Sequence, residues 1–128
     1  MIKAYLGVDV GSVSTNLVIM DENGQLLASS YLRTNGRPIQ TVQEGIQALG
    51  RELAQEVNIM GCGTTGSARY LTSMIIGADV VKNEITAHAI AASHEIENVH
   101  TIIEIGGQDS KIIILRGGVV TDFAMNTV

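Results

Sequence analysis

Cysteine, proline and aromatic residues are scarce in this chain of 128 residues. A single cysteine, Cys62, excludes an internal disulfide framework and a complete all-cysteine metal site within one chain. Aromatic residues make up 3% of the sequence, so a core must be built from Ile, Val, Leu, Ala and Met, which the apolar content of 45% supplies. The length predicts one globular domain, or one lobe together with part of another.

Basic residues and long apolar runs are also few. Eight Lys and Arg against thirteen Asp and Glu give a net charge of −5, which excludes a basic footprint for nucleic acid or an anionic membrane. No apolar run approaches the roughly 18 residues of a membrane span, and the opening residues lack the layout of a signal peptide. We therefore expect a cytoplasmic protein with no nucleic-acid or membrane partner.

The apolar pattern predicts a mixed α/β fold. Three strand-like runs at 3–10, 13–20 and 25–33 are separated by tight turns, which is typical of an antiparallel meander. Beyond them, a helical face is expected from the spacing of Ile39, Val42, Ile46, Leu49 and Leu53. The remaining runs predict a strand at 56–63, helices at 65–75 and 83–98, and strands at 101–106, 110–115 and 119–125. We expect a mixed sheet covered by helices.

Two segments of the sequence share the same order of apolar, acidic, glycine and polar residues, with few identities. DVGSVSTNLVIM (9–20) aligns without a gap with EIGGQDSKIIIL (104–115). Each copy has an acid at the end of an apolar strand, Asp9 or Glu104, followed by a glycine-bearing turn and a second apolar strand. A hairpin turn follows each copy, at 23–24 and 117–118. The matched polar pattern indicates a repeated strand–turn–strand unit.

The repeated turn has the composition of a phosphate-binding loop. Its glycines allow successive backbone N–H groups to form an anion-binding concavity. Lys111 adds a point charge suited to a phosphate oxygen, and Asp9 and Glu104 are placed to hold hydrated magnesium or to orient a water. Two such turns facing each other would clamp a nucleoside triphosphate. Either copy alone is more often an ordinary hairpin turn, but two copies in register favour phosphate binding. The other turn residues expected to face the phosphates are Gly11, Ser12, Ser14, Thr15, Gly106, Gly107 and Ser110.

Several segments resemble those of a known ATPase family. GVDVGSVSTNLVI resembles the first phosphate segment of the sugar kinase, heat-shock-70 and actin superfold. EIGGQDSK resembles the second, in the form found in activators of 2-hydroxyacyl-CoA dehydratases and in benzoyl-CoA reductase ATPase subunits. TTGSAR (64–69), NEITAHA (83–89) and DFAMN (122–126) are similar to further segments of that family. The resemblance implies a ribonuclease H-like, actin-like ATPase lobe at 1–98 and the truncated start of a second similar lobe at 99–128.

This resemblance also implies a function. Family members are homodimers that hold one [4Fe–4S] cluster between subunits, and their ATP hydrolysis drives a low-potential electron into a partner enzyme, here a 2-hydroxyacyl-CoA dehydratase-like enzyme. Asp9 and Glu104 would manage magnesium and the attacking water. The residues implied to hold the phosphates of ATP or ADP are Gly11, Ser12, Ser14 and Thr15 in the first lobe, and Gly106, Gly107, Gln108 and Lys111 in the second.

Two departures from the family pattern limit these expectations. Many relatives carry aspartate where Glu104 stands. The sequence also stops before the Cys-Ala-Ala-Gly-Thr-Gly segment of the family, which would supply a cluster cysteine. We therefore expect the cluster only in a longer parent protein, with weak Mg-nucleotide binding and no turnover by residues 1–128 alone. A small-molecule kinase of the same superfold and a non-catalytic nucleotide-binding interaction module stay open as alternatives.

Other reactive side chains point to structural roles. Cys62 lies among small residues at a strand end and is expected to be buried, because free cysteine usually behaves as a small hydrophobe. Glu84 and His88 are one helical turn apart, but two ligands fall short of a metal site, so a solvated helix face is predicted. Three methionines in apolar runs are expected in the core: Met60, Met74 and Met125.

Overall fold

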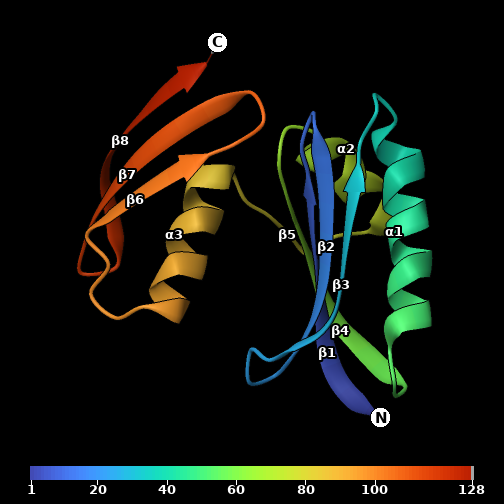
Figure 1. Ribbon diagram of the computed structural model, residues 1–128. Coiled ribbons are helices and arrows are strands. Elements are labelled where there is room, and N and C mark those ends of the chain that lie inside the picture. Colours follow the sequence, from blue (N-terminus) through green and yellow to red (C-terminus); the bar gives the residue numbers. More distant parts are fainter. Residues whose placement is uncertain (128) are drawn as a thin grey trace. The chain divides into compact units, whose positions relative to one another are not determined.

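The computed structural model describes residues 1–127, which form two compact units, Met1–Lys82 and 83–127 (Figure 1). The elements of the first unit are β1 (Ile2–Val10), β2 (Ser14–Asp21), β3 (Leu26–Arg33), α1 (Pro38–Glu52), β4 (Val57–Thr65), α2 (Arg69–Ile76) and β5 (Val80–Val81). Those of the second unit are α3 (Glu84–Glu95), β6 (Thr101–Ile105), β7 (Asp109–Arg116) and β8 (Val119–Thr127). Among the described residues, no helix is long and apolar enough to cross a membrane.

The first unit contains a five-stranded mixed sheet in the order β3-β2-β1-β4-β5. Strands β1, β2 and β3 pair antiparallel through tight turns, whereas β4 and β5 add in parallel after helical crossovers. The predicted three-strand meander and mixed sheet are therefore confirmed. Strand β5, which is two residues long, was not expected because so short a run carries no periodic signal.

The core of the first unit lies between α1 and one face of this sheet. Val42 and Leu49 of α1 pack with Leu17 of β2, and a side chain at Gly45 would overlap Leu17, so glycine allows the helix to approach closely. Two residues of the predicted helical face, Ile39 and Ile46, are 40% and 39% exposed, whereas Val42 and Leu49 are buried.

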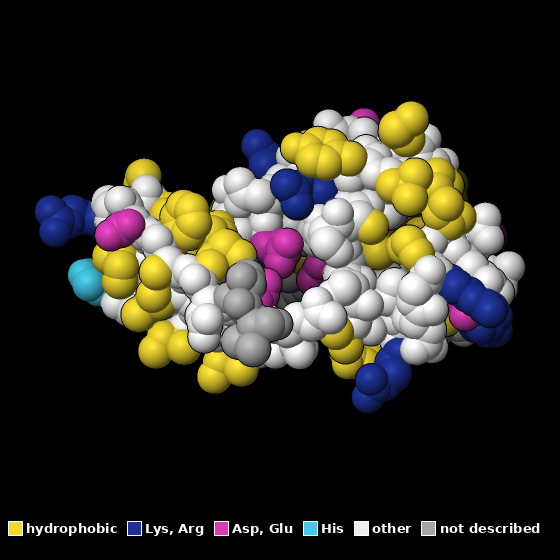
Figure 2. All heavy atoms as spheres, turned by 90° about the horizontal axis from the view of Figure 1, so that it is seen from above, with side chains coloured by type: hydrophobic (Ala, Val, Ile, Leu, Met, Phe, Trp, Pro, Cys, Tyr) yellow, Lys and Arg dark blue, Asp and Glu magenta, His cyan; other side chains and the backbone are white. Residues whose placement is uncertain are grey.

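The methionine predictions were wrong. Met60 is 49% exposed and Met74 is 82% exposed in the first unit, and Met125 of β8 is 47% exposed in the second. Their apolar runs gave the strands and the helix correctly, but neighbouring elements leave much of each side chain uncovered. Exposed hydrophobic side chains are visible on the surface of both units (Figure 2).

The second unit is an antiparallel sheet in the order β6-β7-β8 with α3 on one face. Ala89 of α3 packs against Ile113 and Leu115 of β7. Because α3 contacts all three strands of this sheet, the compact units divide between residues 82 and 83, whereas the sequence placed this helix in a first lobe ending at residue 98.

The repeated unit found in the sequence is also repeated in the strand register. Asp9 pairs with Asn16 across β1 and β2, and Glu104 pairs with Lys111 across β6 and β7, at the same offset as in the alignment. The pairing with the next strand is irregular at the same place in both units. In the first unit the register of β2 with β3 shifts between Ile19 and Met20, and in the second unit the register of β7 with β8 shifts between Ile114 and Leu115. The internal repeat is therefore structural as well as sequential.

Candidate functional site

The first glycine turn joins β1 to β2 and is closed by a backbone hydrogen bond. The N–H of Gly11 donates to the carbonyl oxygen of Ser14 over 2.9 Å, and Ser12 is exposed at the tip. A Cβ at Gly11 would lie 3.2 Å from the same oxygen, so glycine suits the close approach of the two chain segments. The Asn16 amide donates to the Ser14 hydroxyl over 3.3 Å and fixes the start of β2.

Two threonines support this turn from inside the unit. Thr34 donates its hydroxyl proton to the carbonyl oxygen of Gly11 over 2.8 Å, so Thr15, whose Oγ1 lies 2.9 Å from that of Thr34, is the donor in the bond between them. Thr15 is fully buried, and its hydroxyl was expected to face a phosphate. In the structure that hydroxyl donates to Thr34 and braces the turn, and its predicted phosphate contact stays a prediction. Thr34 was missed because the sequence gives no sign of its distant partners.

Asp9 lies at the end of β1, where the loop that follows β4 packs over it. In the strand register Asp9 is flanked by Asn16 of β2 and Thr65 of β4. Gly66 has a φ of +96°, and a Cβ there would overlap the Val10 carbonyl and lie 2.7 Å from Asp9 Oδ1. The Thr65 hydroxyl oxygen is buried and has no hydrogen-bond partner among the described residues. A carboxylate and an unpartnered hydroxyl therefore share this strand end.

Arg69, the last residue of the TTGSAR segment, is used within its own loop. Its guanidinium donates to the Gly66 carbonyl oxygen over 3.0 Å and lies 4.9 Å from the centre of the Tyr70 ring. These contacts hold the loop against the start of α2.

The second glycine turn, between β6 and β7, is closed in the same way as the first. The N–H of Gly106 donates to the carbonyl oxygen of Asp109 over 2.8 Å, and Gly107 and Gln108 are exposed at the tip. In the alignment of the repeat, Gly106 corresponds to Gly11 and Asp109 to Ser14. The same turn geometry therefore occurs at the end of an acid-tipped strand in each unit.

Lys111 lies behind this second turn and is held by three carboxylates. Its Nζ is 2.8 Å from Asp109 Oδ1, 3.2 Å from Glu104 Oε2 and 3.4 Å from Glu84 Oε2, and Lys111 is only 4% exposed. Burial by itself would lower the pKa of Lys111, but the hydrogen bonds to Asp109 and Glu104 and the charges of Glu104 and Glu84 outweigh it, so this pKa is raised. The predicted phosphate contact of Lys111 stays a prediction.

The second unit also contains residues whose surroundings the sequence did not reveal. Glu84, expected on a solvated helix face, is partly buried and paired with Lys111, so that prediction was wrong. Asn83 caps α3 by accepting a hydrogen bond from the Thr86 N–H over 2.8 Å, which places Glu84 in the first helical turn. Nε2 of His88 lies 3.9 Å from Glu104 Oε1.

The carboxylates and the thiol of the described residues can be compared with the ligands that magnesium and a [4Fe–4S] cluster require. No group of three or more His, Cys, Asp or Glu that could hold a metal occurs within the described residues. Magnesium usually needs only one or two carboxylates when phosphates and water complete its shell, so the magnesium role predicted for Asp9 and for Glu104 does not require a larger group of donors in either unit. A [4Fe–4S] cluster needs four thiolates, and Cys62 is the single cysteine of this chain. Cys62 is partly buried, and burial followed by the charge of Asp79 raises its thiol pKa, so these residues do not fit a cluster.

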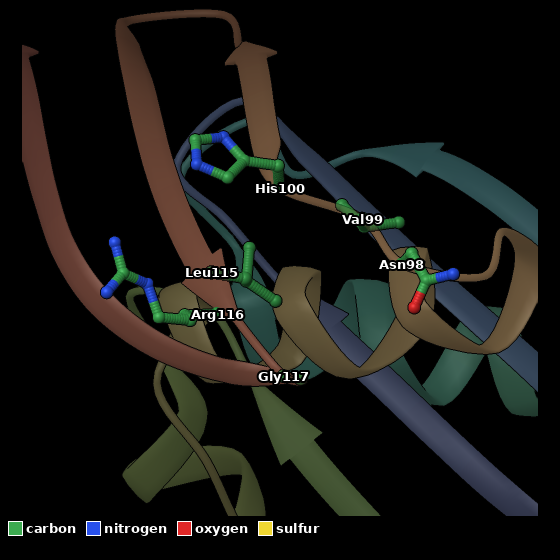
Figure 3. Close-up of a pocket in the computed structure, with 7 residues that line it drawn as sticks. Asn98, Val99, His100, Leu115, Arg116 and Gly117 are labelled. Atoms are coloured by element: carbon green, nitrogen blue, oxygen red, sulfur yellow. The ribbon is translucent and has the colours of Figure 1, made fainter.

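Two hollows in the surface lie away from the turns. One, of about 240 Å³, lies at the opposite end of β7 from residues 106–108; Figure 3 shows His100, Leu115 and Arg116 around it. The other, of about 670 Å³, is lined by the start of α1 and by Leu71. Neither hollow includes a residue predicted to bind nucleotide.

Comparison with known proteins places the chain in a family. A model of the BadF/BadG/BcrA/BcrD ATPase family matches residues 6–128. The (R)-2-hydroxyglutaryl-CoA dehydratase activating ATPase of Acidaminococcus fermentans is 35% identical over 127 residues, covering 94% of this chain and 46% of that protein. The activator of lactoyl-CoA dehydratase of Anaerotignum propionicum is 31% identical over 126 residues, with coverages of 94% and 46%. The chain thus spans about half the length of these relatives.

Solved structures agree with this placement. The activator of 2-hydroxyisocaproyl-CoA dehydratase from Clostridium difficile, with bound ADPNP, has a TM-score of 0.78 and 30% identity over 97% of this chain and 46% of its own. A ROK family glucokinase of Streptomyces griseus, with a TM-score of 0.62 and 17% identity over 91% of this chain and 46% of its own, shares the fold. The predicted actin-like α/β fold is confirmed. Because the family model matches nearly the whole sequence, the chain belongs to the BadF/BadG/BcrA/BcrD ATPase family.

Proposed function

We propose that this chain forms the nucleotide-binding part of an ATPase that activates a 2-hydroxyacyl-CoA dehydratase-like enzyme. The observation that carries the proposal is the pair of matching glycine turns, each closed by the same backbone hydrogen bond beside an acid at a strand end. Backbone N–H groups at such turns bind anions because they carry partial positive charge and meet no bulky side chain. Membership of an ATPase family and the ADPNP bound to a similar activator support nucleotide as the ligand.

The roles divide between groups at the turns and groups beneath them. The tips of the turns offer to the phosphates of ATP or ADP the backbone N–H groups that do not close the turns, together with hydroxyls. Gly11 and Gly106 have no side chain to block the approach of a phosphate. Asp9 and Glu104 would hold magnesium, whose bound form neutralises developing negative charge and orients the attacking water. Thr15 and Thr34 keep the first turn in place. The residues proposed to contact phosphate are Gly11, Ser12, Ser14, Gly106, Gly107 and Gln108.

Electron delivery belongs to the whole protein in this proposal. The donors of residues 1–127 do not fit an iron–sulfur cluster, so we assign them nucleotide binding and not electron transfer. Homodimer formation and closure around the nucleotide would bring the catalytic groups together in that protein. ATP hydrolysis by the whole protein, assayed with and without its acyl-CoA enzyme, separates an activating ATPase from a non-catalytic nucleotide-binding module.

The first test is calorimetric titration of Mg-ADP into residues 1–128, together with Asp9→Asn and Glu22→Gln variants. Both substitutions remove one negative charge with little change of shape, but Glu22 is an exposed residue at the other end of β2. We expect binding by the unmodified chain, a loss of about tenfold or more in Asp9→Asn, which corresponds to about 1.4 kcal/mol, and no change in Glu22→Gln. A folded chain that binds no Mg-ADP, or an Asp9→Asn variant that binds it normally, would contradict the proposal.

A further inference from the structure

We propose that Lys111 is a positioning residue, whose ammonium is the fixed cation that holds Glu104 and Asp109 at the second turn and joins them to Glu84 of α3. This inference deepens the proposed function, on which it rests in one respect: Glu104 is the carboxylate assigned to magnesium there. The sequence favoured a direct phosphate contact for the same lysine. The surroundings of the ammonium group favour the positioning role.

The first argument is a count of hydrogen-bond donors. A lysine ammonium carries three N–H bonds and no acceptor. Three carboxylate oxygens, one each from Asp109, Glu104 and Glu84, lie 2.8 to 3.4 Å from Nζ, and the side chain of Lys111 is only 3% exposed. Two of the three donors therefore form hydrogen bonds, to Glu104 and Asp109, and Glu84 lies within ion-pair distance of the same ammonium. These contacts hold the ammonium inside the second unit, and its 3% exposure leaves little surface for a phosphate to contact.

The second argument is the local charge. Three carboxylates around one ammonium leave a formal excess of two negative charges, which repels phosphate oxygens and attracts cations. This charge disfavours a direct contact between Lys111 and a phosphate. It favours a role in which the ammonium holds the carboxylates together.

The third argument comes from the repeat. Asn16 in the first unit and Lys111 in the second stand opposite the acid at the strand end. The Asn16 amide donates to the side chain of Ser14, and the Lys111 ammonium donates to the side chain of Asp109 at the corresponding position. Both units therefore use a donor at this position to brace the residue that closes the turn. Lys111 does so with a charge, and thereby also holds Glu104 and Glu84.

One consequence distinguishes this role from simple packing. The ammonium of Lys111 is the positive charge that lies among the three carboxylates. Lys111→Met removes this charge and keeps an apolar side chain of similar length. The three carboxylates would then bind a divalent cation from solution, because affinity for such ions rises with the number of charged ligands. Lys111→Arg keeps the charge and would not create such a site.

The test uses residues 1–128 without nucleotide, with Mn²⁺ as the probe and its binding followed by electron paramagnetic resonance. We expect Lys111→Met to bind Mn²⁺ at least about tenfold more tightly than the unmodified chain, and Lys111→Arg to resemble the unmodified chain. Adding Glu84→Gln to Lys111→Met should reverse part of the gain. A folded Lys111→Met variant that binds Mn²⁺ no more tightly than the unmodified chain would overturn the inference.

A second measurement applies even where Lys111→Met does not fold. The chain has three lysines, and Lys3 and Lys82 are exposed, so ¹⁵N-lysine labelling should show one ammonium signal protected from exchange with water. This signal should keep its position on addition of Mg-ADP, while the amide signals of Gly11 and Gly106 move. Absence of a protected signal, or a large shift of it with nucleotide, contradicts the positioning role. Unmoved glycine amides count instead against the proposed function.

Discussion

The two compact units contain the same strand–turn–strand motif, but a helix covers a different face of the motif in each. In the first unit, Val8 and Leu17 are 2% and 0% exposed because α1 packs over them. The residues at the corresponding register positions of the second unit, Ile103 and Ile112, are 70% and 41% exposed. There α3 packs on the opposite face, against the side chain of Ile113. Burial of a strand residue is therefore set by the element that packs on its face, not by the strand sequence.

The turns, in contrast, are the same in both units. Each has a hydrogen bond from the glycine N–H to the carbonyl oxygen three residues later, and each ends a strand that carries an acid. This geometry depends on contacts within a few residues, so it does not change when the covering helix lies on the other face. Local hydrogen bonding explains what the units share, and long-range packing explains how they differ.

The largest effect that sharpens this comparison is expected from Leu17→Ala and its counterpart Ile112→Ala. Removing the fully buried Leu17 side chain leaves a cavity under α1 and should lower the free energy of unfolding by about 3–5 kcal/mol. Ile112 loses less buried surface, so Ile112→Ala should cost about 1 kcal/mol or less. Urea unfolding followed by circular dichroism measures both. Equal losses in the two variants would mean that the exposed face of the second sheet is covered in solution.

A smaller effect tests the loop that packs over Asp9 in the first unit. Gly66→Ala forces a side chain into left-handed backbone and against the Val10 carbonyl, which should cost about 2–4 kcal/mol. Gly36 has a similar φ of +69° but open space around the missing Cβ, so Gly36→Ala is the matched control and should cost about 1 kcal/mol. The two variants are compared by thermal unfolding. A Gly66→Ala variant as stable as Gly36→Ala would show that the loop does not pack on the end of β1.

Much of the fold could be predicted because its signals are local. Alternating apolar residues, helical spacing and glycine turns gave the meander, the helices and the internal repeat, and the strand register then confirmed the repeat. The same patterns indicate which residues share a face without indicating what covers that face. For this reason Met74 was expected in the core and is exposed.

In the candidate site, too, the local features could be predicted from the sequence and the long-range contacts could not. Both turns were found from their glycines and acids, but Glu84 was assigned to a solvated face and Thr34 was missed. Glu84 meets Lys111, and Thr34 meets Thr15 and Gly11, only after elements distant in the sequence have packed together. Side-chain partners of this kind leave no periodic or compositional trace in a single sequence.

The smallest effect concerns the two turn glycines, Gly11 and Gly106. An added Cβ at Gly11 would lie 3.2 Å from the backbone oxygen of Ser14, which can hardly move. At Gly106 the nearest atom would be the side-chain Oε1 of Glu104, at 3.2 Å, and the backbone oxygen of Asp109 would lie at the less crowded distance of 3.4 Å. Substitution by alanine also restricts the unfolded chain, which stabilises by about 0.4–1 kcal/mol where the native backbone tolerates it. We therefore expect Gly11→Ala to cost at most about 1 kcal/mol and Gly106→Ala to leave stability nearly unchanged, both measured by urea unfolding.

The same pair separates stability from binding. In Gly106→Ala the new methyl group pushes aside the Glu104 carboxylate, which is assigned to magnesium, so Mg-ADP affinity should fall while stability is kept. In Gly11→Ala the two quantities should fall together, because the shift is in the turn backbone itself. Titration of Mg-ADP into both variants gives the comparison. If Gly106→Ala binds Mg-ADP as tightly as the unmodified chain, the Glu104 carboxylate does not contribute to Mg-ADP binding. The two turns would then have the same structure but different functions.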